Sequence, residues 1–280
     1  MPSFDTPEPI SVTAFVYAGS IRFTAGDRTD TVVEVRPRDP KKDQDVRAAE
    51  QTEVAYVGDV LTVSTPKANL LGRAGNVDVT VQLPTGSRVD ASGAGGSVVG
   101  EGRLGEVHVK TSAGDVRLDT TGPLTLIASH GASTVDRVEG RAEITSSTGT
   151  VRVGTIDGPA VLKNSHGTMT VAAVTGELRV RGANGGVDIG RAEASVTATT
   201  TNGHLRVADV ARGDVRLETS NGPIEVGIRQ GTAAWLDVTS NRGQVRNSLA
   251  ESEAPERTED AVTVRARTNW GNIDILRAKV

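Results

Sequence analysis

Residues 147–167 read STGTVRVGTIDGPAVLKNSHG, and this stretch decides the fold. Within it, Gly149, Gly158 and Gly167 lie nine residues apart. After Gly149 the chain alternates polar and apolar residues, a period of two that is typical of a half-buried strand. Glycine supplies the positive φ that tight turns need. Each nine-residue unit therefore predicts one strand and one turn.

The same spacing continues through most of the chain. Units that follow a polar turn alternate with units that follow a more apolar lead-in, so the true period is 18 residues with two strands. A fixed repeat of strand and turn is typical of a stacked solenoid. The glycines in this series are Gly105, Gly114, Gly122, Gly131, Gly140, Gly149, Gly158, Gly167, Gly176, Gly185, Gly203, Gly213 and Gly222.

Stacking the repeats places like residues in columns. One column contains Val151, Met169, Val187 and Leu205, continuing to Ile224, Val245 and Ile273. Paired strands lie about 4.8 Å apart, so each side chain would pack on its counterparts in the neighbouring coils. We expect an all-β fold, a right-handed parallel β-solenoid with about 18 residues and two strands per coil. A β-sandwich also has short strands at similar spacing, but it does not require matched columns.

A polar column accompanies the aliphatic ones, three places before many of the glycines. If these side chains point inward, they can bond along the stack and satisfy turn amides. The column contains Thr111, Ser146, Asn164, Thr200, Thr219, Ser240 and Thr268.

We interpret residues 1–280 as a single β-solenoid domain, since the repeat runs through most of the length. Irregular coils are expected over 10–100, with Val54-Tyr56 and Leu61-Val63 fitting one of them less well. Asp39-Pro40 and the helix formers after it predict a short helical insertion near 40–51. Regular repeats follow over 101–247, then an acidic loop over 248–260 and a final coil over 261–276.

Composition limits the functional classes. The chain has a net charge of −4 and no cysteine, so disulfides and thiolate metal sites are excluded. The outward column that contains Arg117, Arg152, Asp188, Arg206 and Glu225 mixes both signs, so we expect no nucleic-acid partner. There is no run of about 18 apolar residues, and the first residues lack the pattern of a secretory signal. We therefore expect no transmembrane segment and a cytoplasmic protein.

No motif predicts catalysis or cofactor binding. Residues 100–105 match the dinucleotide fingerprint G-x-G-x-x-G, but strand alternation follows them where that motif opens a helix. A glycine pair followed by Asp, the calcium-binding repeat, occurs once, at Gly185-Gly186-Val187-Asp188. His130 and His166 occupy the same turn position two coils apart, too far apart to share a zinc ion; with His108 and His204 they are interpreted as exposed. We expect no catalytic, cofactor-binding or metal-binding residues.

Two tryptophans are the candidate interaction residues. Trp235 occupies an outward position by register, and Trp270 is placed in a turn. Exposed tryptophan is typical of interfaces, although each ring could instead cover a loop or the end of the solenoid. The last strand, 270–276, is expected to form an unpaired C-terminal edge, which predicts self-association or an unknown protein partner.

The chain resembles the bacterial putative-adhesin family of β-strand-repeat proteins, a domain of unknown function, over essentially its whole length. The resemblance lies in Phe4-Asp5-Thr6-Pro7-Glu8-Pro9, in Thr31-Val32-Val33-Glu34-Val35 and in the repeated Ser/Asn-Gly-x-Val-x-Val coils, and it is nearest to cytoplasmic actinobacterial members. It implies a β-solenoid with no established enzyme activity. The sequence therefore predicts a non-enzymatic structural or interaction protein. The alternatives are a ligand- or ion-binding sensor module of an envelope-stress system and a carbohydrate-active β-helix enzyme.

Overall fold

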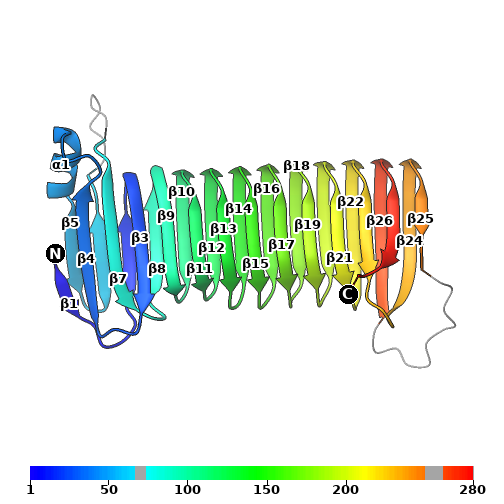
Figure 1. The fold of residues 1–280 in the computed structure, drawn as a ribbon, viewed down its shortest axis with the longest axis horizontal. Helices are drawn as coiled ribbons and strands as arrows, with labels where there is room; N and C mark the ends of the chain where they lie inside the picture. Colours follow the sequence, from blue (N-terminus) through cyan, green and yellow to red (C-terminus); the bar gives the residue numbers. More distant parts are fainter. Residues whose placement is uncertain (67–73, 250–260, 280) are drawn as a thin grey trace. The chain divides into compact units, whose positions relative to one another are not determined.

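The structure, a computed structural model, describes residues 1–66, 74–249 and 261–279. The chain divides into two compact units, Met1–Glu139 and Gly140–Val280. Figure 1 shows the strands of each unit, coloured along the sequence. The acidic loop expected over 248–260 lies almost entirely outside the described residues. The interpretation of the chain as one domain and the right-handed winding stay predictions.

Two sheets of parallel strands form the C-terminal unit, and each coil contributes one strand to each sheet. Leu178 pairs with Val196 and Val187 pairs with Leu205, which confirms a parallel β-solenoid with 18 residues per coil. The first sheet has the order β15 (Val151–Ile156), β17 (Met169–Val174), β19 (Val187–Ala192), β21 (Leu205–Val210), β23 (Ile224–Ile228), β27 (Ile273–Arg277), β25 (Val245–Asn247). The second has the order β14 (Ala142–Thr148), β16 (Ala160–His166), β18 (Leu178–Asn184), β20 (Val196–Asn202), β22 (Gly213–Asn221), β26 (Ala261–Trp270), β24 (Ala233–Arg242).

The predicted aliphatic columns point inward in this unit. Val187 and Leu205 in the first sheet, and Leu178 and Val196 in the second, are at most 1% exposed. Burying a side chain of this size stabilises the fold by about 1.5–3 kcal/mol. Because successive coils contribute the same small side chains, each coil obtains this burial from its neighbours.

Close stacking of the coils explains the glycine at the polar turn. Gly185 and Gly203 have φ angles of 144° and 154°, a region that other residues rarely adopt. A Cβ on Gly185 would lie 2.1 Å from the carbonyl oxygen of Gly167 in the preceding coil. Any side chain at this position would push two coils apart.

The polar column lies beneath these turns. Thr219 and Thr268 are 6% and 3% exposed, so the inward orientation is confirmed. Several of these side chains also bond along the stack as expected, and they do so by donating to the carbonyl oxygens of the turns, whereas the Ser146 hydroxyl has no partner. Thr219 Oγ1 donates to Gly203 O (3.1 Å), Thr268 Oγ1 to Gly222 O (3.0 Å) and Asn164 Nδ2 to Gly149 O (2.8 Å). The ladder therefore satisfies acceptors that the tight turns leave buried.

The N-terminal unit is also built from two sheets. One has the order β1 (Ser3–Asp5), β4 (Asp30–Pro37), β7 (Val77–Pro84), β3 (Ala18–Gly26), β9 (Gly95–Arg103), β11 (Val116–Thr121), β13 (Ser133–Val138). The other has the order β12 (Leu124–His130), β10 (Val107–Ala113), β8 (Arg88–Gly93), β2 (Ser11–Phe15), β6 (Val60–Ser64), β5 (Glu53–Val57). Its strand pairs are parallel except β1–β4, β4–β7 and β5–β6, which are antiparallel. The prediction that 54–56 forms part of a parallel coil was therefore wrong, since β5 and β6 form a hairpin.

The predicted helical insertion is confirmed as α1 (Asp43–Glu50), which begins three residues after Pro40. It packs against β4 and β7. The buried Asp45 carboxylate accepts the backbone N–H of Asp39 and of Asn76 at 3.2 and 2.8 Å. Asp45 thus fixes the helix to both neighbouring segments.

Both units enclose a coil that the sequence order would place elsewhere. In the C-terminal unit, Val264 lies between Val215 and Leu236, and Ile273 lies between Ile224 and Val245. The final coil is therefore inserted, and the prediction that the last strand forms the edge was wrong. In the N-terminal unit β2 likewise lies between β8 and β6, and β3 between β9 and β7.

Candidate interaction surface

The strands β24 and β25 form an open edge in the C-terminal unit. β24 pairs with β26 and β25 pairs with β27, and both stand last in their sheet orders. Among the described residues, no strand pairs with the outer edge of either one. A row of unpaired backbone N–H and C=O groups is a template for another strand. β24 is ten residues long, and its alternate residues direct these groups to the open side.

The last coil is also incompletely covered. Leu236 and Val238 occupy core positions but are only half-buried, and Val245 is 44% exposed. Their partners one strand inward, Val264 and Ile273, are 0% exposed. The core column thus continues to the edge and ends there without a covering layer.

The two tryptophans lie on adjacent strands of this surface but not together. Trp235 is 74% exposed near the start of β24, which confirms its outward orientation. Trp270 is 54% exposed and is the last residue of β26, so its placement in a turn was wrong. The guanidinium of Arg242 lies 4.3 Å from the centre of the Trp270 ring. Seven residues of strand separate Trp235 from Arg242, about 23 Å, so the rings form no common patch.

The sequence reasoning missed β24 as the edge strand. One signal was available in Asn247, which occupies the same inward position as Val207, Val226 and Ile275 in the other coils. In the structure Asn247 belongs to the edge strand β25 and is exposed. A polar residue at a core position is tolerated where no further coil covers it.

The histidines are dispersed. His108 points outward on β10, while His130 and His166 end their strands; all three are exposed, and His204 is half-exposed. His204 Nε2 lies 3.0 Å from Asp188 Oδ2. In the described part of the chain, no group of three or more His, Asp or Glu side chains could hold a metal ion.

Arginines and carboxylates form a network near the connection between β23 and β24. Arg229 makes a forked contact with Asp209, with nitrogen–oxygen distances of 2.8–3.2 Å, and also contacts Glu193. These hydrogen bonds, first those to Asp209 and then those to Glu193, raise the pKa of Arg229 above its ordinary value. Arg277 Nη1 donates to the carbonyl oxygens of Arg229 and Thr232, both at 3.0 Å. The network holds the chain where it passes the inserted coil.

Comparisons with known proteins give a family but no activity. The solved structures that are similar to the chain include a "putative adhesin" from Bacteroides fragilis NCTC 9343 (15% identity, 98% of this chain and 95% of that chain, TM-score 0.37), a "putative adhesin" from Parabacteroides merdae ATCC 43184 (9%, 98% and 94%, 0.39), and a "putative cell adhesion protein" from Clostridium sporogenes ATCC 15579 (10%, 99% and 98%, 0.22). No curated protein matches. Among the described residues, no helix has the length and apolar character needed to cross a bilayer.

The family model that matches is described as Toastrack DUF4097 and covers residues 16–276, nearly the whole chain. Its span includes the regular coils, the inserted final coil and both tryptophans. The protein therefore belongs to the Toastrack DUF4097 family.

Proposed function

We propose that this protein is a non-enzymatic interaction protein whose open C-terminal coil pairs with a second copy of the same chain. The observation that carries the proposal is the unpaired outer edge of β24, together with the half-buried Leu236 and Val238 behind it. A second copy placed there would supply both the missing hydrogen bonds and the missing cover.

A twofold, antiparallel pairing of β24 with itself fits the side chains in one register. Residues directly opposite each other in an antiparallel pair share a face, so core residues must meet core residues. With Leu236 opposite Leu236 of the second copy, Trp235 lies opposite Asp237 and Ala234 opposite Val238. The neighbouring register that also keeps core residues opposite core residues has Asp237 opposite Asp237 of the second copy. Two like charges directly opposite each other destabilise a strand pair. The first register buries apolar pairs and opposes no like charges.

Two neighbouring substitutions distinguish this arrangement from general association. Leu236→Lys would place two ammonium groups opposite each other in the dimer, and we expect it to give a monomer. Trp235→Lys, one residue away, adds the same charge but meets Asp237 of the second copy, so we expect it to keep the dimer. Sedimentation velocity and light scattering across a concentration series measure both variants, and urea unfolding checks that each is folded.

Wild-type protein that remains monomeric at high micromolar concentration would refute the proposal. So would growth into filaments, because a twofold pairing closes at the dimer. Loss of the dimer in both variants would refute the register. The sensor and carbohydrate-active alternatives stay predictions, to be tested by thermal-shift screening with ions and lipids and by assays of sugar cleavage.

A further inference from the structure

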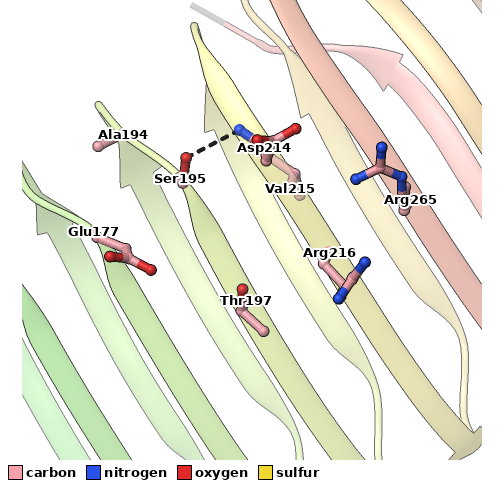
Figure 2. Close-up of a pocket in the computed structure, with 8 residues that line it drawn as sticks. All are labelled: Glu177, Ala194, Ser195, Thr197, Asp214, Val215, Arg216 and Arg265. Carbon is pink, nitrogen blue, oxygen red and sulfur yellow. Dashed lines mark hydrogen bonds between the residues drawn. The ribbon is translucent and has the colours of Figure 1, made fainter.

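The outer face of the second sheet in the C-terminal unit is hollowed around β20. One hollow of about 460 Å³ is lined by Glu177, Ser195, Thr197, Asp214, Arg216 and Arg265. Figure 2 shows Thr197, Arg216 and Arg265 rising from three successive strands, with Glu177 on the opposite side. A second hollow of about 320 Å³ contains Thr199, Glu218 and Arg267. The short threonines of β20 form the floor, and longer charged side chains form the walls.

Like charges stand opposite each other on both sides of this floor. Lys163 pairs in register with Arg181 on the β18 side, and Arg216 pairs with Arg265 on the β22 side. Like charges directly opposite on neighbouring strands destabilise a sheet. The two pairs flank β20 diagonally, because Arg181 stands opposite Thr199 whereas Arg216 stands opposite Thr197. Two strand spacings and two residues of rise place the two pairs roughly 12 Å apart.

These cations are not neutralised by the protein. Among the described residues, no ion pair within 4.0 Å involves Lys163, Arg181, Arg216 or Arg265, and all four are exposed. On the other sheet Arg206 pairs with Glu225 at 2.9 Å, and Arg246 lies 3.9 Å from Asp274. The second sheet therefore presents two pairs of unpaired cations on a chain whose net charge is −4.

Polar groups in the hollow suit a hydroxyl-rich ligand. The backbone N–H of Asp214 donates to Ser195 Oγ at 3.1 Å, which leaves the Ser195 hydroxyl hydrogen available to a ligand (Figure 2). Glu177 is held by Arg179 at 2.8 Å, whereas the Asp214 carboxylate makes no ion pair among the described residues. Hydroxyl, carboxylate and guanidinium groups thus line one groove.

We propose that this groove binds a linear acidic polysaccharide that runs along the stacking direction, across β18, β20 and β22. The guanidinium forks of Arg216 and Arg265 would bind a sugar carboxylate on one side. Lys163 and Arg181, which stand beside Thr199 and outside the lining of the two hollows, would bind a second carboxylate on the other side of β20. Thr197, Ser195 and Asp214 would contact sugar hydroxyls between the two pairs.

The spacing favours this ligand over nucleic acid. Duplex DNA carries one charge about every 1.7 Å, whereas the two cation pairs are separated by roughly 12 Å. The carboxylates of Glu177, Asp214 and Glu218 would repel a dense row of phosphates but accept hydrogen bonds from sugar hydroxyls. The residues that line the two hollows include no aromatic ring on which bases could stack.

Titration of the full-length protein with polygalacturonate by isothermal calorimetry tests the proposal. Neutral dextran and duplex DNA serve as comparison ligands. We expect binding to polygalacturonate that weakens as salt is raised, and no binding to dextran. Arg216→Ser combined with Arg265→Ser should weaken the affinity by about tenfold or more. Arg117→Ser combined with Arg152→Ser removes the same charge from other outward positions and should change it by less than about threefold.

Each opposite result overturns the proposal. Absence of polygalacturonate binding to folded wild-type protein would do so, as would equal loss of affinity in the two double variants. Tighter binding of DNA than of polygalacturonate would show that the groove recognises phosphate polymers instead. None of these results depends on the dimer proposed above, because the groove lies on the sheet face and not on its edge.

Discussion

Replacing Gly185 by alanine tests whether the repeated glycine is required by stacking. Alanine at a φ of 144° occupies a region almost restricted to glycine, which costs roughly 1–3 kcal/mol. Its Cβ would also lie 2.1 Å from Gly167 O. Relieving that contact stretches the hydrogen bonds from Gly167 N to Asn184 O (2.8 Å) and from Thr200 Oγ1 to Gly185 O (3.3 Å), at about 1 kcal/mol each. We expect a loss of about 3–5 kcal/mol.

Urea unfolding followed by circular dichroism measures this loss. Gly26→Ala is the matched control, because a Cβ there meets no atom within 4 Å and the φ of Gly26 is not positive. It should leave the free energy of unfolding unchanged or raise it by up to about 1 kcal/mol. Since coils of a repeat protein can unfold separately, amide hydrogen exchange should place the loss of protection in the coils around Gly185. Equal shifts in the two variants would refute the stacking argument.

Two further predictions concern the interior. Thr219→Val removes the hydroxyl that donates to Gly203 O, and it should cost about 1 kcal/mol of unfolding free energy. Ser146→Ala removes a hydroxyl without a partner and should cost less than about 0.5 kcal/mol. Equal costs in urea unfolding would show that the hydrogen bonds of the polar column do not stabilise the turns. Val187→Asp buries an unpaired charge between the sheets and should cost about 3 kcal/mol or more, while Arg152→Ser should change stability by less than about 0.5 kcal/mol. Similar unfolding midpoints for these last two variants would mean that the strand register is wrong.

The sequence predicts the strands, the turns and the inward columns because these features are local and repeated. The alternation in Thr150-Val151-Arg152-Val153 predicts which side chains point inward, and the same alternation in each neighbouring coil repeats that prediction. Alternation does not predict, however, whether a strand runs parallel or antiparallel to its neighbours. Val54 and Tyr56 alternate as well as Leu61 and Val63 do, yet their strands are antiparallel. A period of two defines a face of a strand and leaves its direction open.

The candidate surfaces were only partly predictable for a related reason. The register placed Trp235 outward correctly, because orientation follows from counting residues. The identity of the edge strand depends on which coil covers which, and Leu236 and Val264 satisfy the same column equally well. The pair of Arg216 and Arg265 was not predictable, because the two residues are 49 positions apart in the numbering and become neighbours through the inserted coil. Lys163 and Arg181 lie 18 positions apart in successive coils, so the repeat alone predicts that pair. To predict contacts of the first kind, one must know the order in which the coils stack as well as the repeat.

The final coil is covered by neighbours on both sides, and the preceding coil forms the edge. Val262, Val264 and Ala266 of the final coil are 0% exposed. The outer coil ends in the three-residue strand β25, which carries Arg246, and a short, charged edge strand limits uncontrolled pairing.

Connectivity gives the outer coil a further property. The first coil of a simple solenoid or its last one can fray from a free chain end, but β24 is joined to β23 before it, where Arg277 holds Arg229 O and Thr232 O. The chain then returns to β26, the strand with which β24 pairs. When the outer coil opens, both of its ends remain attached, so its re-pairing is an intramolecular step at high effective concentration. The edge of β24 should therefore persist as a formed strand, which is the condition that strand addition by a second copy requires.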